Sequence, residues 1–300
     1  MKTNTKNIHW NLSSLDLQNA YTDFLLSRQA ANYTPATLEF YKYTAGRFLS
    51  WIENQGVTDP VDITARHVRA YLAALLDQGK KDTTLHAHAR AIKTLLRFWH
   101  AENYIPSPVK FDMPKLEKKR QPVLDADQLQ TVLKSCTTRE KALILFLADS
   151  GLRRGEVAKL NWDDIDFTSG AVQVRQGKGK KDRVAAIGAT TRRALMQYRR
   201  GQTIKNGAVF LSEKTGSRIT GMGILQIFRR LQKRTGIRIT AHAMRRTFTI
   251  LSLRAGMSPL HLQHLGGWND LTMVDLYSQM VDDDLLTAHR AHSPVDSLRK

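Results

Sequence analysis

Apolar side chains recur every three or four positions through the first hundred residues, the spacing of an amphipathic helix. The clearest run is Leu38, Tyr41, Ala45, Phe48 and Ile52. Thr34 and Pro35 precede it as an N-cap and a first-turn proline, a common helix start. Similar runs predict four helices between residues 15 and 105. Four such helices can bury their apolar stripes against one another, so this half predicts a small helical bundle.

The stretch NYIPSPVKFDMPKLEKKRQPVL then breaks the helical pattern with four prolines and a basic cluster. The cluster consists of Lys115, Lys118, Lys119 and Arg120. Prolines favour an extended linker. A solvated tether and a strap along a phosphate backbone explain the basic cluster equally well. We therefore expect a helical domain at 12–106, a basic linker at 107–122 and a second domain at 123–300.

The second domain returns to helical spacing, apart from AVQVRQ and RVAAI, which read as two strands. The connection GKGKKD is short, so the strands are expected to pair antiparallel. The apolar stretch KALILFLADSG predicts a buried helix. Further helices are expected near residues 190–200, 221–235, 242–255, 258–265, 270–279 and 283–291. The predicted fold class is mainly α, with one small antiparallel β-sheet.

The net charge of the chain restricts the classes of partner that it is expected to bind. The chain has 46 Lys and Arg against 27 Asp and Glu, a formal net charge of +19. Such a surface attracts polyanions, of which nucleic acid is the commonest. No apolar run approaches the roughly 20 residues of a membrane-spanning helix, and the N-terminus lacks the apolar core of a signal peptide. The single cysteine, Cys136, excludes an internal disulfide and fits a reducing compartment. We expect a cytoplasmic, nucleoid-associated protein without membrane partners.

Four stretches carry candidate chemistry: SGLRRGEVAKL, GKGKKDR, AHAMRRTF and LGGWNDLTMVDLYS. Each alone has an ordinary explanation as solvated arginines, a basic turn or a packed aromatic. His242 and Arg245 share a helix face, which suits a phosphodiester because one group exchanges a proton while the other holds oxygens. Arg246 is also near that face, and spacing alone does not choose between the two arginines.

In their order along residues 151–277, these stretches resemble the tyrosine recombinases, or phage integrase family, of the simple two-domain Xer and Cre type. The helical half resembles the family's SAM-like core-binding domain. The linker resembles its interdomain strap, and 123–300 its catalytic domain with a C-terminal helix. The resemblance implies a site-specific recombinase that cleaves and rejoins DNA strands through a 3′-phosphotyrosyl intermediate, in integration, excision or resolution.

The resemblance also assigns roles by position. It implies phosphate-binding arginines, a general acid, a histidine, an acidic residue that orients the arginine or the histidine, and a nucleophile. These are Arg153 and Arg245, Lys178, His242, Glu156 and Tyr277. Lys180 and Lys181 join the linker cluster as expected DNA contacts. The resemblance selects Arg153 and Arg245 over their neighbours Arg154 and Arg246.

Trp268 stands nine positions before Tyr277, where many family members have histidine and a minority tryptophan. Its indole N–H can donate a hydrogen bond but cannot accept a proton. We therefore expect Trp268 to donate to a phosphate oxygen while its ring packs the helix of the nucleophile.

The implied chemistry needs neither metal nor ATP, so no cofactor is expected. The expected partners are double-stranded recombination sites and three further copies of the chain in a homotetramer, with the C-terminal helix docking on a neighbour. About a dozen residues precede the first expected helix, so we expect a two-domain recombinase without the additional arm-binding domain of some phage integrases. A type IB topoisomerase and a non-catalytic DNA-binding protein are the alternatives.

A metal nuclease is the weakest alternative, because the aspartates at 163, 164 and 166 read as turn residues and those at 282–284 as a helix start. His261 and His264 share a helix face but lack an evident third ligand.

Overall fold

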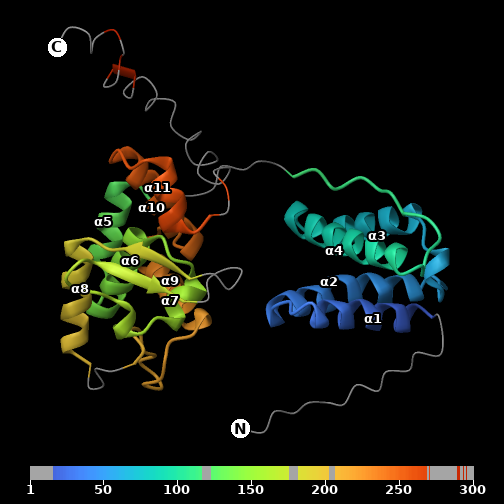
Figure 1. The fold of residues 1–300 in the computed structure, drawn as a ribbon, viewed down its shortest axis with the longest axis horizontal. Helices are drawn as coiled ribbons and strands as arrows, with labels where there is room; N and C mark the ends of the chain where they lie inside the picture. The colour runs from blue at the N-terminus through green and yellow to red at the C-terminus, as the bar shows by residue number, and fades with distance from the viewer. Residues whose placement is uncertain are drawn as a thin grey trace. The chain divides into compact units, whose positions relative to one another are not determined.

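The computed structural model describes residues 16–116, 123–175, 182–202 and 207–268, together with 270, 289, 290, 293 and 295. The chain divides into two compact units, Met1–Lys119 and Arg120–Lys300, each with its own hydrophobic core. Figure 1 shows the elements of both units. No helix in the described ranges is long and apolar enough to cross a bilayer.

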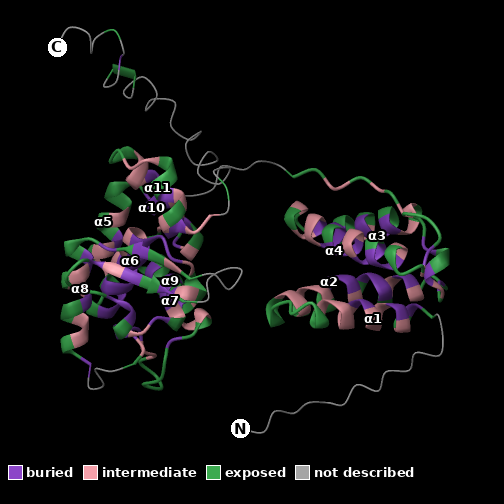
Figure 2. Ribbon diagram, viewed as in Figure 1, coloured by how far each residue is buried: buried purple, intermediate pink, exposed green. Residues whose placement is uncertain are grey.

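The described part of the first unit is a bundle of four α-helices, as predicted. They are α1 (Leu17–Ala30), α2 (Pro35–Glu53), α3 (Ala65–Asp77) and α4 (Asp82–Ala101), with a short 3-10 helix at Pro60–Asp62. Thr34 caps α2 through its side chain, which accepts from the Thr37 N–H. Trp99 is fully buried and donates its indole N–H to the Ala20 carbonyl at 2.9 Å. That bond ties the last helix of the bundle to the first, with their apolar stripes inside (Figure 2).

In its described residues, the second unit combines helices with an antiparallel pair of β-strands, also as predicted. Its helices are α5 (Ala126–Lys134), α6 (Thr138–Ser150), α7 (Arg154–Lys159), α8 (Ala189–Arg200), α9 (Gly221–Thr235), α10 (Ala241–Arg254) and α11 (Pro259–Gly266), with a 3-10 helix at Trp162–Asp164. The apolar helix α6 packs between α8 and α10. Asp125 and Gln128 form the capping box that starts α5.

Strands β1 (Ala171–Val174) and β2 (Arg183–Ala186) pair antiparallel, with Val174 opposite Arg183. They are shorter than the apolar runs suggested, and Arg183 is the first residue of β2. Strand β2 also packs against α11, which brings the hairpin beside the end of that helix. The expected helix at 270–279 lies outside the described residues except for Asp270, and of the one at 283–291 only 289 and 290 are described, both helical.

Candidate active site

The first candidate arginine is positioned by a sharp turn between α6 and α7. Gly151 ends α6 with a φ of 61°, a left-handed conformation that favours glycine. A Cβ on Gly151 would also lie 2.3 Å from the ring of Phe248. The turn therefore requires glycine, and it places Arg153 at the start of α7.

Glu156, in the first turn of α7, fixes the position of Arg153. Its carboxylate accepts from the Arg153 backbone N–H at 2.8 Å and from Nη1 of the same residue at 3.0 Å. Burial by itself would raise the pKa of Glu156, but hydrogen bonds from Arg183 and from the Arg153 N–H outweigh it and hold the pKa at about 2. Glu156 is therefore an ionised acceptor at neutral pH. The sequence prediction that it orients a neighbour stays a prediction, with this contact to Arg153 in its favour.

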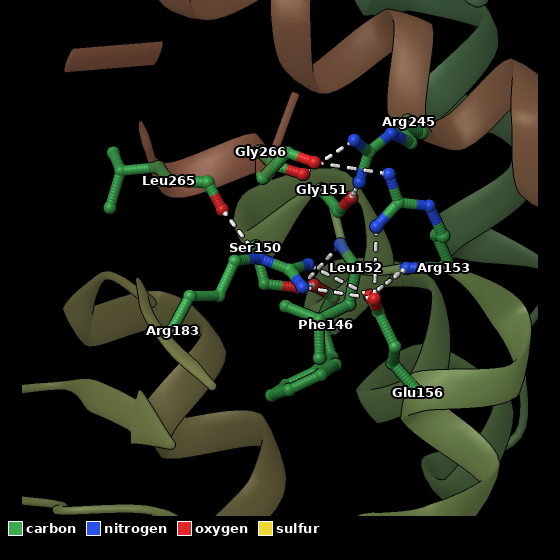
Figure 3. Close-up of polar contacts among 11 residues, drawn as sticks. Phe146, Ser150, Gly151, Leu152, Arg153, Glu156, Arg183, Arg245, Leu265 and Gly266 are labelled. Carbon is green, nitrogen blue, oxygen red and sulfur yellow. Dashed lines mark hydrogen bonds and ion pairs between the residues drawn. The ribbon is translucent and has the colours of Figure 1, made fainter. Parts of the chain in front are cut away.

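The second candidate arginine is buried. Arg245 is 4% exposed, whereas its neighbour Arg246 is half-buried. Arg245 donates Nη1 to the Gly151 carbonyl at 2.6 Å and Nη2 to the Gly266 carbonyl. The guanidinium thus joins the turn that leads to Arg153 with the end of α11 (Figure 3).

A pocket of about 720 Å³ opens beside the starts of α7 and α10. Its lining includes one histidine and several arginines: Arg153, Arg154, Arg238, His242, Arg245 and Arg246. No carboxylate is among its described lining residues. Residues 153 and 245 are far apart in sequence, yet both line this one pocket. Such a surface is built to hold an anion.

His242 lies at the start of α10, whose N-cap Thr240 accepts from the Ala243 N–H. The side chain is exposed and lines the pocket. Loss of water around part of the ring, followed by the charges of nearby arginines, lowers the pKa of His242 below its ordinary value. The arginines are Arg246, Arg245, Arg153 and Arg154. The ring is therefore neutral at pH 7, with one nitrogen able to accept a proton.

Trp268 stacks on the second arginine. The Arg245 guanidinium carbon lies 4.3 Å from the centroid of the Trp268 ring, a cation–π contact. The same ring covers Gly266, where a Cβ would lie 2.1 Å from a ring carbon. The Trp268 ring therefore leaves no room for a side chain at position 266. The sequence does not reveal this cation–π contact between Trp268 and Arg245.

Sequence reasoning missed Arg183. Its Nη1 and Nη2 donate to the two oxygens of Glu156 at 2.9 and 2.8 Å, and its Nε donates to the Leu265 carbonyl at 3.3 Å. The only available signal was its place at the end of the GKGKKDR stretch, where it read as part of a basic turn and a strand start.

Several predicted site residues lie outside the described residues. These are Lys118, Lys119 and Arg120 of the linker, Lys178, Lys180 and Lys181 of the hairpin connection, and Tyr277. Lys115 is described and exposed, in the first unit. The structure thus brings Arg153, Glu156, His242, Arg245 and Trp268 together, and of the other predicted site residues it describes only Lys115.

Two of the aspartates considered above as metal ligands accept hydrogen bonds from nearby backbone N–H groups. Asp164 accepts from the Asn161 N–H at 2.9 Å, and Asp166 accepts from the Thr168 N–H at 2.8 Å. Within the described ranges, no three His, Cys, Asp or Glu side chains gather as a metal site would need. Cys136 follows α5 and lies outside any helix, and burial raises the pKa of its thiol to about 11. That thiol is therefore protonated and a poor nucleophile at neutral pH.

Comparison with known proteins gives consistent matches over most of the chain. The sequence model described as "Phage integrase family" matches residues 122–283, and that of the "Phage integrase, N-terminal SAM-like domain" matches residues 21–97. The tyrosine recombinase XerA of Saccharolobus solfataricus is 28% identical over 283 residues, covering 90% of each chain.

Two solved structures show the same fold at lower identity. A lambda integrase dimer bound to a COC′ core site has a TM-score of 0.72 at 20% identity, covering 87% of this chain and 95% of that one. A lambda integrase tetramer bound to a Holliday junction has a TM-score of 0.70 at 19% identity, covering 89% and 84%.

Proposed function

The chain belongs to the phage integrase family, and from that premise we propose how its pocket works. The protein is a site-specific tyrosine recombinase, an enzyme that cleaves and rejoins DNA strands. We assign the basic pocket as the place where the scissile phosphate is held. The observation that carries this assignment is the convergence of Arg153, His242 and Arg245 on one pocket without a described carboxylate in its lining.

In the proposed reaction, the Tyr277 hydroxyl attacks the phosphorus of the scissile phosphodiester. A bond forms between the phenol oxygen and phosphorus, and the bond from phosphorus to the 5′ oxygen breaks. His242 takes the phenol proton, which its lowered pKa permits at neutral pH. Lys178 gives a proton to the leaving 5′ oxygen. The product is a 3′-phosphotyrosyl link and a free 5′ hydroxyl, so a 5′ hydroxyl from another strand can reverse the reaction.

Arg153 and Arg245 oppose the negative charge that grows on the non-bridging oxygens in the five-coordinate transition state. Their backbone contacts support this role, because they hold both guanidinium groups before substrate arrives. Such preorganised donors need no rearrangement at the moment of reaction.

The proposed partner is duplex DNA carrying recombination sites. The net charge of +19 supports it, and the basic residues Lys115, Lys118, Lys119, Arg120, Lys180 and Lys181 are its proposed contacts. The proposed division is a core-binding domain at 12–106, a linker at 107–122 and a catalytic domain at 123–300. We also propose that four copies synapse two sites and that half of them act at one time. The lambda integrase tetramer bound to a Holliday junction supports the tetrameric part of this proposal.

Cleavage is expected to proceed fully in EDTA. The test uses a duplex recovered by binding from a random-sequence library and then nicked near the binding site (the selected duplex). A denaturing gel should show a covalent protein–DNA adduct at the same level with and without EDTA, because arginines replace metal ions as charge stabilisers. Cutting that requires metal and yields no adduct would contradict the proposed function. Strand exchange between two selected sites then separates a recombinase from an enzyme that only relaxes DNA.

Replacing Trp268 with Phe should slow adduct formation about 10-fold, the worth of one hydrogen bond to a charged group. Phe keeps a ring that can stack on Arg245 but lacks the indole N–H. Trp268→His should be tolerated better, because imidazole retains a donor. Single-turnover cleavage of the selected duplex measures the three rates. Equal rates for the wild type and Trp268→Phe would mean that the ring only packs.

A further inference from the structure

Hydrogen bonds on two sides fix the position of the Arg183 guanidinium. Its paired nitrogens meet both oxygens of Glu156, a bidentate arrangement, while Nε meets the carbonyl of Leu265. The side chains of Arg183 and Glu156 are 13% and 9% exposed, so water screens this pair weakly. Figure 3 shows Arg183 on the side of Glu156 away from Arg153.

The Glu156 carboxylate stands between two arginines. Arg153 lines the pocket and is 30% exposed, whereas Arg183 is not among the residues that line it. Arg183 therefore does not line the pocket itself, and its first route to the phosphate is through Glu156. Arg183 occupies both oxygens of the Glu156 carboxylate, so Arg153 makes only one side-chain hydrogen bond to Glu156, through Nη1. The Nη2 group of Arg153 then donates to the Gly267 carbonyl.

Arg183 also takes part in a second arrangement, at the end of α11. Three consecutive carbonyl groups there accept from three different arginines. Leu265 accepts from Arg183, Gly266 from Arg245 and Gly267 from Arg153. The last carbonyls of a helix have no partners within the helix, so they need such donors. A Cβ on Gly267 would lie 2.6 Å from the Arg183 Nε, which shows how closely the backbone passes the guanidinium.

We propose that Arg183 is a positioning residue for DNA cleavage: it aligns Arg153 through Glu156 and fixes the turn at residues 265–268, which precedes the segment of Tyr277. This inference rests on the proposed function. Without Arg183, Glu156 has one arginine left and pairs with it more fully. Arg153 is then drawn away from the phosphate, and the turn loses one of its three donors.

The test compares variants on two DNA substrates. Arg183→Met should slow single-turnover adduct formation on the selected duplex by roughly 10- to 100-fold, the scale on which a misplacement of about 1 Å acts. Arg183→Lys should fall between it and the wild type, because an ammonium carries the charge but cannot span two carboxylate oxygens and a carbonyl. Gel-shift affinity for the selected duplex should stay within about 2-fold of the wild type, since Arg183 acts after binding.

The second substrate carries a methylphosphonate at the scissile position, which removes the negative charge that Arg153 offsets. The Arg183→Met defect should shrink on this neutral substrate. It should also be smaller in an Arg153→Lys background than in the wild type, because residues that act partly through one route are non-additive. A loss of packing alone would slow both substrates equally and add to the Arg153→Lys defect, and that result would overturn the proposal.

Arg192→Met is the matched control. Arg192 is a half-buried arginine of α8 that donates to the Phe167 and Thr168 carbonyls and makes no described contact with the site. The Arg192→Met variant should cleave both substrates at wild-type rates even if its melting temperature falls. Should Arg183→Met fail to fold, Arg183→Lys makes the same comparison. A wild type that forms no adduct would count against the proposed function, whereas a wild-type rate in the Arg183 variants would count against this inference alone.

Discussion

A Tyr277→Phe variant should bind the selected duplex with unchanged affinity and form no covalent adduct. The phenol oxygen is the only atom removed, and it is the atom proposed to bond phosphorus. A tyrosine hydroxyl has a pKa of about 10, so its reactivity depends on a base and on charge stabilisation at the phosphate. In the proposed mechanism, His242 supplies the base, and Arg153 and Arg245 supply the charge stabilisation. The loss should therefore be complete on the timescale of wild-type cleavage.

Tyr198→Phe is the matched control for this variant. Its hydroxyl accepts from the Leu211 N–H at 3.3 Å, and its ring stacks on Phe210 in the core of the same unit. Loss of that hydroxyl should reduce stability modestly and leave adduct formation intact. An adduct that persists in Tyr277→Phe would place the nucleophile on another residue, which peptide mapping of the adduct would identify.

An Arg245→Met variant should lose cleavage on the order of 10²- to 10³-fold, the usual loss when one transition-state donor is removed. It should also be less stable. The carbonyls of Gly151 and Gly266 each lose a donor, and an unsatisfied buried carbonyl costs about 1–3 kcal/mol. Single-turnover cleavage measures the first effect, and urea denaturation monitored by circular dichroism measures the second.

Arg246→Met is the informative comparison, because the sequence alone does not separate the two arginines. Arg246 also lines the pocket, but it is half-buried. Its removal should weaken DNA binding more than it slows the cleavage of bound DNA. Equal cleavage losses in the two variants would contradict the assignment of Arg245 as the preorganised phosphate ligand.

The glycine pair at 266 and 267 illustrates how the site depends on side chains from other elements. Gly266 lies under the Trp268 ring, and Gly267 lies against Arg183 with a φ of 64°. A side chain at position 266 would collide with Trp268, and one at position 267 would collide with Arg183. The sequence marks this stretch as a helix end, but it does not show that three arginines bind its carbonyls.

The sequence by itself determined the described helices and several of their caps, and it named the candidate residues of the site. Helical periodicity and capping join residues three or four positions apart, so Thr34, Asp125 and the apolar face of α2 could be read directly from the chain. The four ordered stretches carried the resemblance that named Arg153, His242 and Arg245. Periodicity and capping are local signals, and the resemblance depends on the order of short motifs along the chain.

Only the tertiary structure decided how the site residues are held. Arg183 bonds Glu156 across 27 positions, and Arg153 bonds the Gly267 carbonyl across 114. No local pattern encodes such pairs, because they form only when α7, β2 and α11 pack together. The burial of Arg245 under Trp268 has the same origin. The physical reason is that a buried guanidinium requires several fixed acceptors, and here distant segments of the chain provide them.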